Sequence, residues 1–191
     1  MKDLLTNVRN CRVCQEDLPN TPRPIIQASD KAKIVIIGQA PGLKVQQSGI
    51  PWDDASGKNL RDWLGIDNHT FYDENEIALL PMGFCYPGTG KSGDLPPRPE
   101  CAPLWHQKVL ENMPAVKLKL LVGQYAQQYY LKDKCASTLT DTVRNFNAFL
   151  PNYLPLPHPS PRNNIWQKKN PWFKEELITV LQHHIQSILF N

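Results

Sequence analysis

The chain has 191 residues, of which 18 are prolines, and a formal net charge of +3 at pH 7. Its length suits one domain with a buried core, and its charge is too small to indicate a nucleic-acid partner by itself. Its longest apolar runs fall short of the ~18 residues that cross a bilayer, and "MKDLLTNVRN" lacks the apolar core of a signal peptide. We therefore expect a single domain over residues 1–191 that is cytoplasmic, monomeric and not associated with membranes.

Four segments have the pattern of strands, and they cover residues 33–38, 76–84, 116–123 and 153–160. The first, "KIVIIG", is β-branched and almost wholly apolar, as in a parallel strand that is covered on both faces. Pro81 is expected to stop the second strand. Helical patterns lie between the strands, at residues 56–66, 98–113 and 124–132. In the first helix Ser56 is placed to cap the start, and Gly65 marks the end.

The C-terminal segment has the clearest helical pattern. Asn170 is placed to cap this helix, and Pro171 suits its first position. An apolar stripe follows at helical spacing, which we expect to be core: Phe173, Leu177, Val180, Leu181, Ile185, Ile188 and Leu189. Short strands that alternate with helices predict an α/β fold, a three-layer α/β/α sandwich around a mainly parallel, four-stranded sheet.

Cysteine spacing is informative. Cys11 and Cys14 form a CxxC pair, and Cys85, Cys101 and Cys135 follow much later. In a reducing compartment such spacing indicates metal or cluster ligation before disulfides. The alternative is a set of ordinary buried thiols.

Three loops follow the predicted strands and mix Gly or Pro with polar residues: "GQAPG" (38–42), "CYPGTGKSGDLPPRPEC" (85–101) and "HPSPRN" (158–163). In an open parallel sheet, ligands bind beyond the carboxyl ends of the strands. Glycines let backbone N–H groups approach a ligand, and prolines keep a loop stiff. Each loop alone is compatible with plain turn chemistry. Their joint placement predicts a ligand site.

The segments "GQAPG", "SGIPWDDASGKNL" (48–60) and "HPSPRN" occur in an order that resembles the uracil-DNA glycosylase superfamily, and most of all its iron–sulfur branch. The resemblance implies the α/β/α fold of that superfamily and a base-excision repair activity on DNA. It also implies a [4Fe–4S] cluster, held by Cys11, Cys14, Cys85 and Cys101. Zinc in a four-cysteine site is the alternative, and Cys135 is expected to be a structural thiol.

Enzymes of this kind extrude a base from the DNA stack into a tight pocket and cleave its glycosidic bond. Trp52 stands where the family has a stacking phenylalanine, and His158 stands at the motif histidine that hydrogen-bonds the departing base. The resemblance also places Gly38, Ala40 and Pro81 at the base. Pro81 occupies the position of the asparagine that reads uracil in the iron–sulfur branch, so uracil specificity does not carry over directly.

The catalytic positions also depart from the family. Gln39 stands where the iron–sulfur branch has a glutamate, and an amide can orient a water molecule but cannot act as a base. Asp54, in "DASG", resembles a carboxylate that serves members without a polar residue in the first loop. Asp53 is the alternative, and both aspartates are also suited to capping the following helix.

Other residues are expected to contact DNA. Ser160 matches a phosphate-binding position, and Arg162 stands where some relatives insert an apolar wedge into the duplex. Lys168 and Lys169 lie in "NNIWQKKNPW", where basic and aromatic residues alternate as on a phosphate-facing surface. The alternative for these lysines is simple solvation.

The leading hypothesis is a DNA glycosylase that removes uracil or another deaminated or damaged base, with Gln39, Asp54 and His158 as the catalytic residues. A second hypothesis is a DNA-binding or damage-recognition protein without catalysis, which is motivated by Gln39 and Pro81. A third is a hydrolase of free nucleosides or nucleotides that uses the same pocket.

Overall fold

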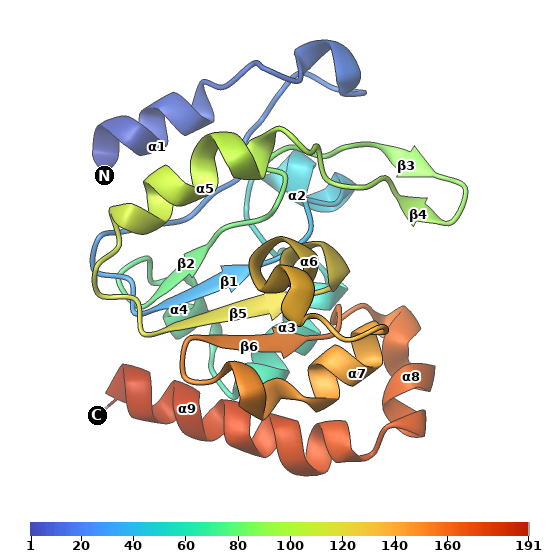
Figure 1. The fold of residues 1–191 in the computed structure, drawn as a ribbon. Helices are drawn as coiled ribbons and strands as arrows, with labels where there is room; N and C mark the ends of the chain where they lie inside the picture. The colour runs from blue at the N-terminus through green and yellow to red at the C-terminus, as the bar shows by residue number, and fades with distance from the viewer. Residues whose placement is uncertain (191) are drawn as a thin grey trace.

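The computed structural model describes residues 1–190, and Figure 1 shows its arrangement. The α-helices are α1 Lys2–Arg9, α2 Leu43–Ser48, α3 Ala55–Leu64, α4 Asn68–Tyr72, α5 Cys101–Glu111, α6 Gln124–Leu131, α7 Leu139–Arg144, α8 Asn164–Lys169 and α9 Thr179–Phe190. The strands are β1 Ile34–Ile37, β2 Ile77–Leu79, β3 Thr89–Gly90, β4 Gly93–Asp94, β5 Leu118–Val122 and β6 Tyr153–Leu156. Shorter helical turns cover Gln15–Asp17, Lys132–Lys134, Phe146–Phe149, Pro161–Asn163 and Phe173–Ile178.

The central sheet has four parallel strands in the order β2-β1-β5-β6. All four predicted strands are confirmed, although each is shorter than its apolar segment. Ile34 pairs with Ile77 on one side and with Leu118 on the other. β1 lies between two other strands and is also covered by helices on both faces, which explains why it carries no polar residue.

Alternate residues of β1 face two separate apolar layers. Ile34 and Ile36 pack with residues of α3, α4 and α9, whereas Val35 and Ile37 pack with residues of α1, α5 and α6. The sheet is therefore covered on both faces by helices, and the predicted three-layer α/β/α sandwich is confirmed. Among residues 1–190, no helix has the length and apolar character that crossing a membrane requires.

The caps expected at Ser56 and Asn170 are wrong, whereas the alternative cap at Asp54 is confirmed. Asp54 rather than Ser56 caps α3, because its carboxylate accepts a hydrogen bond from Gly57 N at 2.8 Å. The Asn170 side chain accepts a hydrogen bond from the Trp172 indole instead of capping the C-terminal helix, whose first turns are π-helical. The apolar stripe of this helix packs into or against the core, as predicted.

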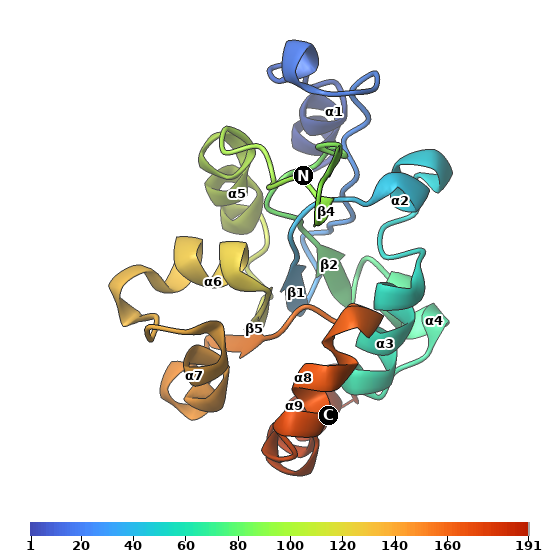
Figure 2. The ribbon, with the colours of Figure 1, turned by 90° about the vertical axis from the view of Figure 1, so that its right-hand side faces the viewer.

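The four parallel strands end at the same edge of the sheet, and Figure 2 looks onto this edge, with β4, α2, α3 and α8 around it. The segment that we expected to be a plain loop, residues 85–101, contains the antiparallel hairpin β3–β4. Figure 1 shows this hairpin projecting beyond the strand ends. Both chain ends lie at the opposite edge.

Candidate functional site

A cavity of about 430 Å³ opens at the carboxyl ends of the strands. It takes residues from all three loops that we singled out, and most of the residues predicted for the site line it: Gly38, Gln39, Ala40, Trp52, Asp54, Pro81, His158, Ser160 and Arg162. Parallel strands gather their following loops at one edge, which is why segments far apart in the sequence meet here.

The loop after β1 is fixed by its backbone. The Gly38 carbonyl accepts a hydrogen bond from Met82 N at 2.9 Å, and the Gln39 carbonyl accepts one from Gly83 N at 3.0 Å. The Gln39 side chain donates to the Leu95 carbonyl at 3.5 Å. This loop is therefore tied both to the chain that follows β2 and to the end of the hairpin.

Trp52 lies in a space that two glycines create. A Cβ atom at Gly38 would stand 2.7 Å from the indole ring, and a Cβ atom at Gly57 would stand 1.8 Å from the Trp52 carbonyl oxygen. Trp52 also has a positive φ of 59°, which is rare for a bulky residue. Such an unfavourable backbone conformation is retained only where the surroundings hold it, and it often marks a functional site.

His158 follows β6 and is largely desolvated. Burial lowers the pKa of its imidazole below the ordinary value, and the charge of Asp54 opposes this shift. Ser160 N donates a hydrogen bond to His158 Nδ1 at 3.2 Å. Because Nδ1 accepts, the neutral ring carries its proton on Nε2. The site therefore offers an N–H donor at near-neutral pH.

Asp54 caps α3 and also faces the cavity. One carboxylate oxygen accepts the capping hydrogen bond from Gly57 N, and the residue also lines the cavity. Asp53 stands outside the cavity wall. Of the two aspartates, Asp54 is therefore the one that is placed to act in the site.

Pro81 lines the cavity, and its carbonyl oxygen is engaged on the other side. His106 Nε2 lies 3.0 Å from this oxygen, and His106 Nδ1 lies 2.6 Å from the Tyr130 hydroxyl. Since a carbonyl only accepts, Nε2 is the donor and Nδ1 accepts from Tyr130. Burial lowers the pKa of His106 to about 4, so the ring stays neutral. Sequence reasoning missed this pair because both residues lie in segments that read as ordinary amphipathic helices.

The hairpin adds a group that sequence reasoning missed. Asp94 lines the cavity together with Ser92 and Gly93. Desolvation raises the pKa of the Asp94 carboxyl; the charge of Arg162 opposes this shift, and that of Asp54 adds to it. Spaced glycines in "GTGKSGD" are the signal that could have predicted the hairpin, but not its position over the cavity.

Arg162 and Ser160 reach the cavity from the loop after β6. Arg162 Nη1 donates to the Ser92 carbonyl at 3.1 Å, so in this structure the guanidinium binds the hairpin. The Ser160 hydroxyl accepts a hydrogen bond from Arg162 N at 3.3 Å. These contacts hold both side chains at the cavity rim.

Lys168 and Lys169 lie apart from the cavity, at the exposed end of α8. The expected alternation of basic and aromatic residues on this surface is wrong. Trp172 is 9% exposed, and Trp166 packs edge-on against Trp172 and Phe173 while its indole N–H bonds Thr140. Trp172 therefore belongs to the core, whereas Trp166 is partly buried and lines a small cavity beside Gln39 and His158.

The four cysteines of the predicted cluster share a second, smaller cavity, whose lining includes Cys11, Cys14, Cys85 and Cys101. All four are free thiols. Burial raises the pKa of Cys14 and Cys85 to about 11. The fifth cysteine, Cys135, is partly buried and packs against the apolar layer that contains residues of α1, α5 and α6.

The geometry of these thiols can be compared with what each metal group needs. Within residues 1–190, no three His, Cys, Asp or Glu side chains are arranged to hold a metal ion. A zinc ion needs its ligand sulfurs at about 2.3 Å, whereas a [4Fe–4S] cluster binds each thiolate to a different iron and holds them further apart. The four thiols therefore line one space, but in the described part of the chain they are not grouped as the ligands of a metal ion.

The family model described as the Uracil DNA glycosylase superfamily matches residues 26–182. A curated relative, the type-4 uracil-DNA glycosylase of Archaeoglobus fulgidus, is 26% identical over an alignment of 136 positions that covers 68% of this chain. The match spans 62% of that relative, less than two thirds of its length. The solution NMR structure of a candidate uracil DNA glycosylase from Methanosarcina acetivorans aligns with 82% of this chain and 93% of its own, at 16% identity and a TM-score of 0.45.

Proposed function

Because this chain belongs to the uracil DNA glycosylase superfamily, we propose that it is a DNA N-glycosylase that removes uracil or another deaminated or damaged base. The observation that carries the proposal is the common cavity of Trp52 and His158. This cavity contains both an aromatic ring, on which a base can stack, and an N–H donor for the edge of the base. Its volume of about 430 Å³ is within the range of pockets that enclose small ligands.

In this proposal the extruded base stacks on Trp52. The C1′–N bond breaks, and its electron pair stays on the base while positive charge develops on the sugar. The His158 Nε2–H donates to the base oxygen where negative charge grows, which is the type of stabilisation that an oxyanion hole provides. Water adds to C1′, and one of its protons ends on the base nitrogen.

We assign the positioning of this water to Gln39 and Asp54. Gln39 cannot take a proton, but its amide can hold a water molecule through hydrogen bonds. Asp54 lines the cavity and acts electrostatically on His158. Its capping bond to Gly57 N restricts the orientation of the carboxylate.

The wall of the cavity supports a substrate range wider than uracil. Pro81 has no side-chain amide, and its carbonyl is held by His106. Selection of the base therefore depends on the backbone groups of Gly38 and Ala40 and on the cavity side chains. We propose a deaminated or damaged base as the substrate class.

We further propose that DNA runs across the cavity rim and α8. Ser160 and Arg162 are placed at the rim, and Lys168 and Lys169 extend the positive charge along α8. Phosphate contacts of this kind supply affinity without sequence preference.

Cys11, Cys14, Cys85 and Cys101 are proposed to hold a [4Fe–4S] cluster. Support comes from their common cavity and from their free thiols. When bound, such a cluster supplies a fixed link between the N-terminal segment and the ends of the hairpin segment. In this way the four cysteines help to position the hairpin over the cavity.

The test is base release from oligonucleotides that carry uracil, hypoxanthine or xanthine, as single strands and in each mismatch, with abasic sites scored. We expect release from at least one substrate, and a loss of about 10²-fold or more in His158→Ala, as for other removed transition-state donors. Salt-sensitive binding without any abasic product would instead support the recognition protein that Gln39 and Pro81 motivate. Turnover of free nucleosides alone would favour the nucleoside hydrolase.

A further inference from the structure

The hairpin β3–β4 is held against the cavity from two sides. The Gln39 side chain donates to the Leu95 carbonyl at 3.5 Å, and Arg162 Nη1 donates to the Ser92 carbonyl at 3.1 Å. The hairpin is closed at its base by the hydrogen bond from Leu95 N to Gly88 O at 2.8 Å. Both loops that resemble family motifs therefore contact this segment directly.

These contacts bring Asp94 to the loop that follows β1. A Cβ atom on Gly42 would lie 3.4 Å from Asp94 Oδ2, so the carboxylate stands in van der Waals reach of that loop. Asp94 remains accessible from solvent and lines the cavity. The ion pairs of the described chain engage Asp17, Glu76 and Glu100, so they leave this carboxylate free of a fixed cationic partner.

Asp54 and Asp94 are the two carboxylates in the cavity wall, and their surroundings differ. One carboxylate oxygen of Asp54 accepts a hydrogen bond from Gly57 N at the N-terminus of α3. Asp94 comes from a hairpin strand and has no helix to cap. Its charge is therefore the one that can respond most directly to charge in the cavity.

Building on the proposed function, we propose that Asp94 is a catalytic carboxylate that stabilises the sugar cation. When the C1′–N bond breaks, its electron pair leaves with the base, and positive charge is shared by C1′ and the ring oxygen. The Asp94 carboxylate lies beside this charge and stabilises it without forming a bond. Water then adds to C1′ and supplies the proton that the base takes up.

The negative charge that Gln39 lacks is thus supplied by a neighbouring residue of the hairpin. Partial burial raises the pKa of the Asp94 carboxyl, and the charge of Arg162 opposes this increase.

Two abasic-site analogues test the position of this charge without turnover. One oligonucleotide carries a pyrrolidine, which is cationic where the sugar cation forms, and the other carries a neutral tetrahydrofuran. We expect the wild-type protein to bind the pyrrolidine oligonucleotide about tenfold more tightly, and Asp94→Asn to lose this preference while it binds tetrahydrofuran normally. Such a difference isolates charge from general DNA affinity.

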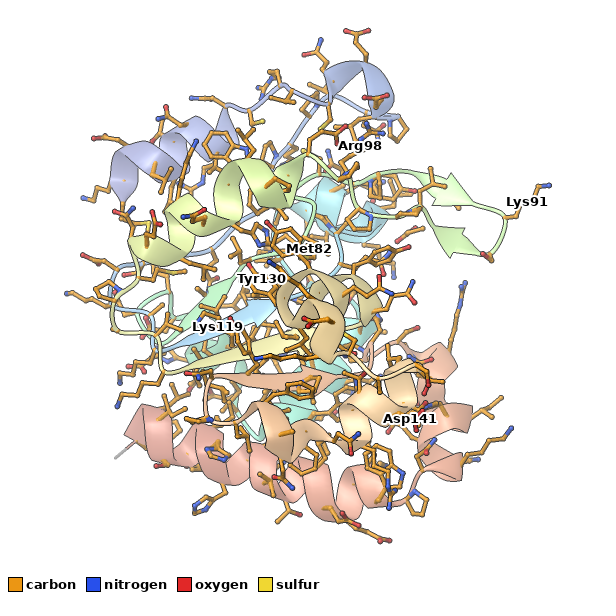
Figure 3. The ribbon with its side chains drawn as sticks, viewed as in Figure 1. Met82, Lys91, Arg98, Lys119, Tyr130 and Asp141 are labelled. Carbon is orange, nitrogen blue, oxygen red and sulfur yellow. The ribbon has the colours of Figure 1, made fainter. Side chains whose placement is uncertain are left out.

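Asp54→Asn and Lys91→Ala are the matched variants. Lys91 lies on the same hairpin, and Figure 3 shows its side chain extending away from the tip. Both variants are expected to keep the preference for pyrrolidine. Three results would refute the role of Asp94. They are a preference for pyrrolidine that persists in Asp94→Asn, a preference that is lost only in Asp54→Asn, and a wild-type protein that shows no preference.

Base release separates this inference from the proposed function. Asp94→Asn is expected to slow single-turnover release by about 10²-fold. Release at the wild-type rate in this variant would refute the catalytic role of Asp94 and leave the glycosylase assignment intact. Conversely, a preference for pyrrolidine that depends on Asp94, without release of any base, would refute the glycosylase assignment and leave Asp94 placed at the sugar.

Discussion

The rings of Trp52 and His158 lie 6.0 Å apart between their centroids, with their planes inclined by 33°. The two residues come from opposite ends of the chain, and β1 and β6 lie on either side of β5 in the sheet that brings them together. In the proposed function, the extruded base stacks on this indole and receives the hydrogen bond of the imidazole. This pair defines the geometry that the following predictions test.

Stacking on Trp52 can be measured by truncating the ring. Trp52→Ala should lower single-turnover base release by about 5–150-fold, because stacking on an aromatic ring contributes about 1–3 kcal/mol per base. Trp52→Phe should retain most of the rate, since a smaller ring still presents a face. Equal rates in the wild-type protein and in Trp52→Ala would show that the indole is only a core residue.

Gly57→Ala should destabilise the protein by about 1–3 kcal/mol, the usual cost of overpacking. In an unhindered helix the same change stabilises by up to about 1 kcal/mol, so the expected sign is reversed. The reason is the 1.8 Å approach of the new Cβ atom to the Trp52 carbonyl oxygen. Thermal unfolding measures the effect, with the exposed neighbour Lys58→Ala as the control; a higher Tm for Gly57→Ala would contradict the packing.

His106 should make the protein less stable in acid. Its pKa is lowered from 6.5 to about 4 in the folded state, so below pH 6.5 the unfolded chain binds a proton that the folded chain does not. Stability is therefore lost as the pH falls from 6.5 toward 4, by about 2 kcal/mol at pH 5 relative to pH 8. His106→Gln keeps a donor for the Pro81 carbonyl and removes this titration.

Urea unfolding at pH 5 and pH 8 provides the measurement. We expect the loss between the two pH values to be smaller in His106→Gln than in the wild-type protein. His158, whose pKa is also lowered, is present in both proteins and cancels in the comparison. Identical losses would contradict the neutral state of His106.

Loss of one proposed cluster ligand should remove the cluster. Cys101→Ser, purified without oxygen, is expected to lose the absorption near about 400 nm and most of the roughly four irons per chain that a [4Fe–4S] protein contains. Cys135→Ser should keep both, because Cys135 lies away from the shared cavity. A colourless wild-type protein that contains zinc would contradict the cluster.

The basic end of α8 should control the salt dependence of DNA binding. Replacing Lys168 and Lys169 by alanine is expected to reduce the slope of log K against log[salt] by about 2, because each phosphate contact contributes about 0.9. Lys2→Ala, at the start of α1, should leave the slope unchanged. An unchanged slope in the double variant would show that these lysines are only solvated.

The parts of the fold that follow from local pattern were predictable. The apolar run of β1 and the spacing of the C-terminal stripe each reflect one buried surface, so the sequence alone indicates them. The shared edge of a parallel sheet then places Gln39, Trp52 and His158 together. The position of Asp94 was not predictable in this way, because it depends on the hydrogen bonds that Gln39 and Arg162 donate to the hairpin.

Other errors have a similar physical cause. Spacing in "NNIWQKKNPW" does not reveal that Trp166 contacts Thr140 and Phe173, because these contacts depend on how other elements pack against α8. The cap of α3 was ambiguous because Asp54 and Ser56 both suit a helix start. Oligomeric state and the catalytic roles of individual residues stay predictions.

The fit of Trp52 between Gly38 and Gly57 has a consequence for how this site can change over generations. A smaller residue at position 52 leaves both glycines acceptable, so that step is open from the present chain. Alanine at position 38 is obstructed while the indole is in place, and alanine at position 57 is obstructed by the backbone carbonyl of residue 52 whatever side chain stands there. Once Gly38 had been exchanged, a return to tryptophan at position 52 would be closed, which makes the order of substitutions at these two positions a one-way path.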